Sequence, residues 1–154
     1  MNKDKQLIYE QYLAVTESTK QKPVVDSDGT KRWYNENGER HREDGPAIEY
    51  ADGTKRWYIN DKRHREDGPA VEYADGGKFW YIDNKLHRED GPAIEHTDGT
   101  KFWHINGKLY NTIPEWTKAL FDYKGWTPEF LASKGKDYGK LVNIYAQKMI
   151  DKYE

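Results

Sequence analysis

A heptapeptide, His-Arg-Glu-Asp-Gly-Pro-Ala, occurs three times in this chain, at residues 41–47, 64–70 and 87–93. Successive copies begin 23 residues apart. A fixed period of this length indicates that copies of one supersecondary unit are stacked in a row. The 154 residues leave room for such an array with small caps at its ends.

Composition narrows the classes of partner and compartment. Charged residues make up 34% of the chain and the net charge is −2, so bulk electrostatics favour neither nucleic acid nor an anionic membrane. The hydrophobic fraction is only 35%, but 14% is aromatic, whereas a disordered chain would lack such rings. The absence of cysteine excludes disulfides and thiolate metal sites. No signal peptide and no apolar run of ~20 residues is found, so we expect a soluble, cytoplasmic protein.

Each repeat is expected to consist of strands joined by two tight turns. The first turn is Asp-Gly, which predicts a two-residue type I′ loop with positive φ at both positions. The second turn is of the same chemical kind. In the first unit, the longer interval from Trp33 to His41 predicts a bulge or longer loop at 35–38. The first turns are Asp52-Gly53, Asp75-Gly76 and Asp98-Gly99, and the second turns are Asn60-Asp61, Asp83-Asn84 and Asn106-Gly107.

Two-residue loops at both turns fix a strand register. Glu49 would lie opposite Arg56, and Ile48 opposite Trp57. Because side chains alternate across a sheet, one face would carry the tryptophans and histidines and form the core. The other face would change from charged to apolar along the array, and would either dock the C-terminal helices or meet a partner. Its members would be Glu49, Arg56, Tyr58, Arg63, Glu72, Phe79, Tyr81, Leu86, Glu95, Phe102, His104 and Leu109.

Both ends of the chain are predicted to be helical. Apolar residues at helical spacing predict an amphipathic helix over 3–18. After Asn111 the period stops, and Thr112 with Glu115 forms a capping-box pattern. Further helices are expected from Pro128 and from about 137 to 153. The predicted fold is mainly β with helical ends (α+β): an N-terminal helix and linker (1–22), an elongated antiparallel β-meander of hairpin repeats (23–111), and a C-terminal helical cap (112–154).

The repeat resembles a known family. The sequence Trp-Tyr-Ile-Asn-Asp-Lys-Arg-His at 57–64, followed by Asp-Gly-Pro-Ala and then Asp-Gly, is similar to the MORN repeat family, closest to its variant form. The resemblance covers residues 24–110, although the usual Tyr-x-Gly opening is absent and Pro follows the Gly in every copy. It implies a long, twisted sheet of hairpins with a scaffolding or binding role and no particular chemistry. It also implies a likeness to small proteins carried by bacteriophages and bacteria.

The heptapeptide itself is expected to set the strand register. Each Asp is predicted to accept backbone N–H bonds in an Asx-type turn, each Gly to permit positive φ, and each Pro to fix the exit into the next strand. The arginines are expected to pair with acidic side chains across units, such as Glu43 or Glu66. These residues are Arg42, Asp44, Gly45, Arg65, Asp67, Gly68, Arg88, Asp90 and Gly91.

The five histidines are the residues with the greatest chemical potential. Equivalent histidines in adjacent units would be at least two strands, or ~9–10 Å, apart. Two ligands of one metal must lie within ~4 Å of each other. The fourth unit also has Tyr110 where the others have His. We therefore predict no metal, no cofactor and no catalytic residue, and expect His41, His64, His87, His96 and His104 to be structural.

The sequence thus favours a non-catalytic protein-interaction module that binds another protein. In a phage, this would be an inhibitor of a host or defence factor, for example of the CRISPR type. One alternative is nucleic-acid binding through rows of Trp, Tyr and Lys, as in Lys55-Arg56-Trp57-Tyr58. A third is a histidine-dependent hydrolase. The predicted partner-contact residues are Tyr58, Phe79, Tyr81, Leu86, Phe102, His104, Leu109, Trp116 and Trp126.

Overall fold

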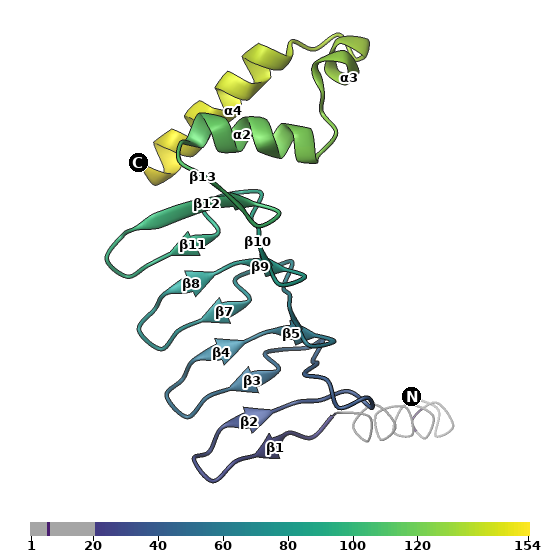
Figure 1. Ribbon diagram of the computed structural model, residues 1–154, viewed down its shortest axis with the longest axis vertical. Coiled ribbons are helices and arrows are strands. Elements are labelled where there is room, and N and C mark those ends of the chain that lie inside the picture. Colours follow the sequence, from purple (N-terminus) through teal and green to yellow (C-terminus); the bar gives the residue numbers. More distant parts are fainter. Residues whose placement is uncertain (1–5, 7–20) are drawn as a thin grey trace.

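A computed structural model of the protein describes Gln6 and residues 21–154. Residues 24–110 form a ladder of short antiparallel strands joined by loops, with three helices stacked on its C-terminal end (Figure 1). The mainly antiparallel meander and the C-terminal helices agree with the expected α+β layout. The helix expected over 3–18 lies outside the described residues.

Among the described residues the main sheet has nine strands: four successive pairs, one pair from each unit, and a last strand that pairs with the one before it. In spatial order they are β1 (Val24–Val25), β2 (Lys31–Arg32), β3 (Ile48–Glu49), β4 (Lys55–Arg56), β7 (Val71–Glu72), β8 (Lys78–Phe79), β11 (Ile94–Glu95), β12 (Lys101–Ile105) and β13 (Lys108–Tyr110). A second row of hairpins lies beside the sheet. It comprises β5 (Tyr58–Ile59) with β6 (Lys62–Arg63), and β9 (Tyr81–Ile82) with β10 (Lys85–Leu86).

The two turns of each unit differ in geometry. At the second turn, Asn60 and Asp61 both have positive φ, and Ile59 pairs with Lys62, as a two-residue type I′ loop requires. The expected second turns are therefore confirmed. At the first turn, only the glycine has positive φ, and Tyr50 donates its N–H to the Thr54 carbonyl. This is a three-residue loop that ends in a left-handed glycine, so the predicted type I′ Asp-Gly loop is wrong.

The extra loop residue shifts the register of the main sheet by one position. Ile48 lies opposite Arg56, and Glu49 lies opposite Lys55. A one-residue shift in register exchanges the two faces of a strand. The face that was predicted to carry the glutamates therefore carries aliphatic residues, and the glutamates lie on the opposite face. One face now carries the row Arg32, Ile48, Arg56, Val71, Phe79, Ile94 and Phe102. The other carries the alternating row Lys31, Glu49, Lys55, Glu72, Lys78, Glu95 and Lys101.

The longer loop of the first unit is present where it was predicted. Asn35 donates its N–H to the Glu39 carbonyl, and Gly38 has a φ of 78°. The Asn35 side chain accepts hydrogen bonds from the backbone N–H groups of Asn37 and Glu39. The insertion is therefore absorbed within one turn, and the following residues return to the repeat geometry.

The three helices are α2 (Ile113–Tyr123), α3 (Pro128–Ser133) and α4 (Tyr138–Tyr153). Each begins at a polar N-cap whose side chain accepts a backbone N–H, namely Thr112, Thr127 and Asp137. Helices α2 and α4 pack on the last unit through a core that includes Trp103, Trp116 and Met149. The rings of Trp103 and Trp116 are 4.8 Å apart and meet edge to face. The helices thus cover the end of the array on the tryptophan side, and not the changing face of the sheet.

None of the helices in the described residues is both long enough and apolar enough to cross a lipid bilayer.

Candidate interaction surfaces

The heptapeptide loop is held by a repeated contact between arginine and tryptophan. The guanidinium carbons of Arg42, Arg65 and Arg88 lie 4.1, 4.1 and 3.8 Å from the ring centroids of Trp33, Trp57 and Trp80. Each arginine also donates to an Asp, a Pro carbonyl and a Glu of its own unit, which in the case of Arg65 are Asp67, the Pro69 carbonyl and Glu72. These acceptors belong to the arginine's own unit, so the predicted pairing across units with Glu43 or Glu66 is wrong.

The glycine of the heptapeptide makes room for this arginine. Gly45, Gly68 and Gly91 do not have positive φ, contrary to expectation. A Cβ atom at Gly68 would lie 2.9 Å from the Arg65 guanidinium carbon, and one at Gly45 would lie 3.0 Å from that of Arg42. In addition, Asp67 accepts a hydrogen bond from the Arg65 side chain at 2.8 Å. This arginine lowers the pKa of the Asp67 carboxyl.

The histidines of the heptapeptide connect neighbouring units. The Nδ1 atom of His87 accepts the backbone N–H of Asn106, in the second turn of the next unit, at 3.0 Å. The equivalent contacts join His41 to Asn60 and His64 to Asp83, each at 3.3 Å. Burial lowers the pKa of His87, and its ring also lies 4.7 Å from that of Tyr123 in α2. Within residues 21–154, no three His, Cys, Asp or Glu side chains are placed to hold a metal ion.

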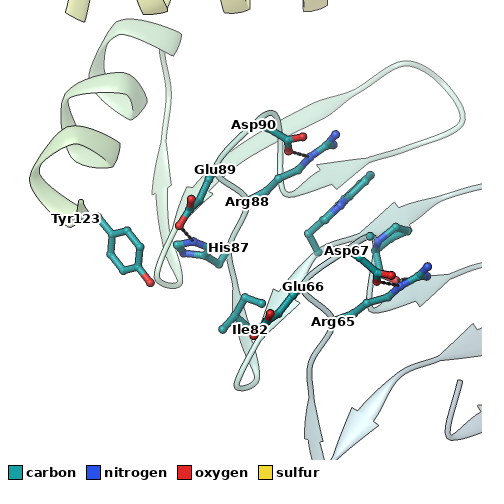
Figure 2. Close-up of a pocket in the computed structure, with 12 residues that line it drawn as sticks. Arg65, Glu66, Asp67, Ile82, His87, Arg88, Glu89, Asp90 and Tyr123 are labelled. Atoms are coloured by element: carbon teal, nitrogen blue, oxygen red, sulfur yellow. Dashed lines mark hydrogen bonds and ion pairs between the residues drawn. The ribbon is translucent and has the colours of Figure 1, made fainter. Parts of the chain in front are cut away.

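Open pockets lie between successive heptapeptide loops. One of about 810 Å³ is bordered by Glu66, His87 and Glu89, with Trp80 and Ile82 among its apolar lining residues (Figure 2). An equivalent pocket of about 840 Å³ is found one unit earlier, over Trp57. Figure 2 shows that the polar side chains here are engaged with one another, with Arg88 bonded to Asp90 and His87 near Glu89. These pockets are therefore a consequence of the repeat, and their charged groups are largely neutralised.

The changing face of the sheet carries a run of rings, which we call the aromatic ladder: the exposed Tyr73, His96 and Phe102 and the half-buried Phe79. Neighbouring rings meet edge to face, with centroid separations of 5.2, 5.4 and 5.9 Å. Tyr73 is 39% exposed and Phe102 is 37% exposed. Val71, which lies opposite Phe79 on the same face of the sheet, is buried. The ladder thus shields the sheet with its inner edges and leaves its outer edges open to solvent.

Arginines and tyrosines continue this face toward the N-terminus. Arg56 is paired with Val71 across the sheet and lies 5.0 Å from the Tyr50 ring centroid. Its buried Nε has no hydrogen-bond partner among the described residues. In the adjacent row of hairpins, Arg40 lies over Tyr58 at 4.2 Å and Arg63 over Tyr81 at 4.1 Å. Cationic groups therefore flank the aromatic ladder on one side.

The nine predicted contact residues do not form one surface. Three of them are buried and are unavailable for contact: Tyr58 packs on Ala47 and Ile48, His104 lies in β12, and Trp116 is fully enclosed in the cap core. Burial also lowers the pKa of His104. Phe79, Tyr81 and Leu86 are half-buried, whereas Phe102 and Leu109 are exposed on the array. Trp126 is 39% exposed but lies on the cap, away from these residues in the fold.

Two residues of the aromatic ladder, Tyr73 and His96, were missed in the sequence. They follow Val71 and Ile94 by two positions and therefore share their face. The incorrect register placed Ile48 opposite Trp57, and it therefore put Val71 and Ile94, which are the equivalents of Ile48 in later units, on the tryptophan side. The sequence feature that could have identified these two residues is the spacing of three positions between the aromatic residue and the Gly of each first turn.

A third candidate surface lies on the cap. Trp126, Phe130 and Ile144 are 39%, 43% and 56% exposed and line a groove of about 570 Å³ between α3 and α4. Phe121 and Leu131 are buried at its base. No protein-family model, no curated protein and no solved structure matches the chain, so its surfaces alone bear on what it does.

Proposed function

We propose that the protein is a non-catalytic binding protein whose aromatic ladder contacts another protein. The observation that carries the proposal is the unbroken run of edge-to-face rings from Tyr73 to Phe102, open to solvent along its outer side. Contiguous exposed apolar surface of this kind marks interaction sites in soluble proteins, and aromatic residues dominate binding energy at such sites.

The neighbouring charges indicate the chemistry of the partner. Arg56 adjoins the ladder, its Nε has no hydrogen-bond partner within the described part of the chain, and the register places the glutamates on the opposite face. A partner surface with an apolar centre and carboxylates along one border would match both features. We further propose that the repeats are a variant of the MORN type, that the protein acts in the cytoplasm, and that in a phage its partner would be a host or defence factor.

Paired variants on one strand test the binding surface. Phe102→Glu places a charge within the ladder, whereas Lys101→Gln alters the neighbouring side chain on the opposite face of β12. We expect a protein that co-purifies with the wild type, and that binds it again as a purified component, to be lost with Phe102→Glu and retained with Lys101→Gln. Equal binding of that protein by the wild type and both variants would contradict the proposal. Circular dichroism would establish that each variant is folded.

The corrected register also supports a second candidate, single-stranded nucleic acid. Arginines lie over tyrosine rings in the contacts of Arg56 with Tyr50 and of Arg63 with Tyr81, and among the described residues the sheet row that contains Arg56 holds no glutamate. Such an arrangement suits base stacking next to phosphate contacts. Against it stand the net charge of −2 and the ion pair of Arg40 with Asp61. A gel shift with single-stranded probes over a salt series tests this candidate, because an affinity that depends on phosphate contacts falls steeply as salt is raised.

A further inference from the structure

The apolar groove on the cap is bordered by basic residues. Lys134 follows α3, Lys136 lies in the α3–α4 loop, and Lys148 lies on α4. None of the described residues that line the groove is acidic. Within residues 21–154, no carboxylate lies within ion-pair distance of any of these three lysines. The groove therefore combines an apolar floor with an uncompensated positive border.

The shape of the groove follows from the helix period. Leu141, Ile144, Tyr145 and Lys148 line it at intervals of three and four residues, which places them along one side of α4. From Leu141 to Lys148 this stripe extends about 10 Å, at 1.5 Å per residue. That length matches two turns of a partner helix, which would present apolar anchors at the same three- and four-residue spacing.

We propose that this groove binds an acidic amphipathic helix of a partner protein, with the apolar side of the helix between Trp126 and Ile144. The carboxylates of the helix would lie against Lys134, Lys136 and Lys148. Charge complementarity selects this occupant. The lysines stand at separate positions around the border, so they match several spaced carboxylates, whereas a fatty acid supplies a single charged group. This surface is separate from the aromatic ladder, so the inference does not depend on the proposed function.

A labelled peptide provides the test with the full chain. The probe is a fluorescein-labelled helical peptide of about 14 residues with Leu at helical spacing and Glu on its polar side. Its controls are the same peptide with Lys in place of Glu, and a scrambled peptide of the same composition. We expect saturable fluorescence anisotropy for the acidic amphipathic peptide only. Binding should weaken as salt is raised from about 0.05 M to about 0.5 M, since border charges are screened.

Matched variants locate the contact. Lys148→Glu should weaken binding of the acidic peptide about three- to tenfold, because it replaces an attraction at the border of the groove by a repulsion. Lys118→Glu, on an exposed position of α2 outside the groove, makes the same charge change and should leave binding unaltered. Ile144→Glu should abolish binding. It is 56% exposed, so the fold should persist, which circular dichroism would verify.

Several outcomes would overturn the proposal. These are absence of saturable binding, equal binding of the acidic, basic and scrambled peptides, or equal loss with Lys148→Glu and Lys118→Glu. Binding of sodium decanoate to the groove without binding of the acidic peptide would assign the surface to a single-chain lipid instead. Loss of the aromatic-ladder partner with Phe102→Glu would have no bearing on any of these results.

Discussion

The guanidinium carbon of Arg65 lies 4.1 Å from the centre of the Trp57 ring, and the same side chain donates to Asp67, to the Pro69 carbonyl and to Glu72. One residue thus fixes both ends of the heptapeptide loop and its position over the sheet. Because the arrangement recurs at Arg42 and Arg88, it explains why the loop can be irregular and yet identical in each unit.

We predict that Arg65→Lys lowers the free energy of unfolding by about 1–2 kcal/mol. Lysine keeps the charge but lacks the planar fork that stacks on a ring while donating to several acceptors. Urea unfolding followed by tryptophan fluorescence measures the change. Arg56→Lys is the control, because Arg56 lies 5.0 Å from Tyr50 and no described residue accepts a hydrogen bond from its Nε. Equal effects of the two substitutions would contradict the assigned role of Arg65.

Gly68→Ala should destabilise the protein through Arg65. The added Cβ would lie 2.9 Å from the Arg65 guanidinium carbon, so the arginine must move, at a cost of about 1 kcal/mol. In an Arg65→Ala background this cost should largely disappear, which a double-mutant cycle measures. Gly53→Ala is the comparison, because its Cβ would meet no atom within 4 Å and its cost arises from a φ of +93°. That cost should be the same with or without Arg65.

The stability of the protein should fall as pH decreases from about 7 to about 5, and His87 should contribute to the fall. Burial lowers the pKa of His87 in the folded chain below the unfolded value of about 6.5, so the unfolded state binds the proton more readily. The contribution is present above the unfolded pKa and is lost as pH falls through the folded one. His87→Gln should flatten the pH dependence of the urea midpoint over this range. An unchanged slope would show that His87 does not titrate differently in the two states.

Trp116 and Trp126 should respond differently to the same truncation. Trp116 is fully buried against Trp103, so Trp116→Ala should cost about 3–5 kcal/mol. Trp126 is 39% exposed beside the groove, so Trp126→Ala should cost less than half as much. Thermal unfolding of the two variants checks this. Similar losses would mean that the groove belongs to the core of the cap.

The sequence predicted the parts of the fold that depend on local chemistry. The Asn-Asp and Asp-Asn turns were identified because few residues tolerate positive φ at two successive positions. The starts of the helices at Thr112, Thr127 and Asp137 were likewise predicted to within about one residue, because a capping side chain accepts a hydrogen bond from the backbone of its own helix. The 23-residue period established the meander itself.

The parts that were not predicted depend on non-local contacts. Asp-Gly is compatible with both a two-residue and a three-residue loop, and only pairing between strands shows that Glu49 faces Lys55. That single ambiguity transferred Ile48 and Val71 between faces and concealed Tyr73 and His96. The burial of Trp116 followed from helix docking on Trp103, which no local pattern specifies. The lysine border of the groove likewise depends on the packing of α3 against α4, because its residues lie apart in the sequence.

A photo-reactive benzoyl-phenylalanine placed at position 102 would report directly on what touches the aromatic ladder. Position 102 already carries an exposed ring, so the replacement preserves the surface, and position 101 on the opposite face of β12 is the matched control. After irradiation in producing cells, we expect a covalent protein adduct from position 102 and none from position 101. The absence of a protein adduct at position 102, or the same adduct from both positions, would contradict recognition through this face.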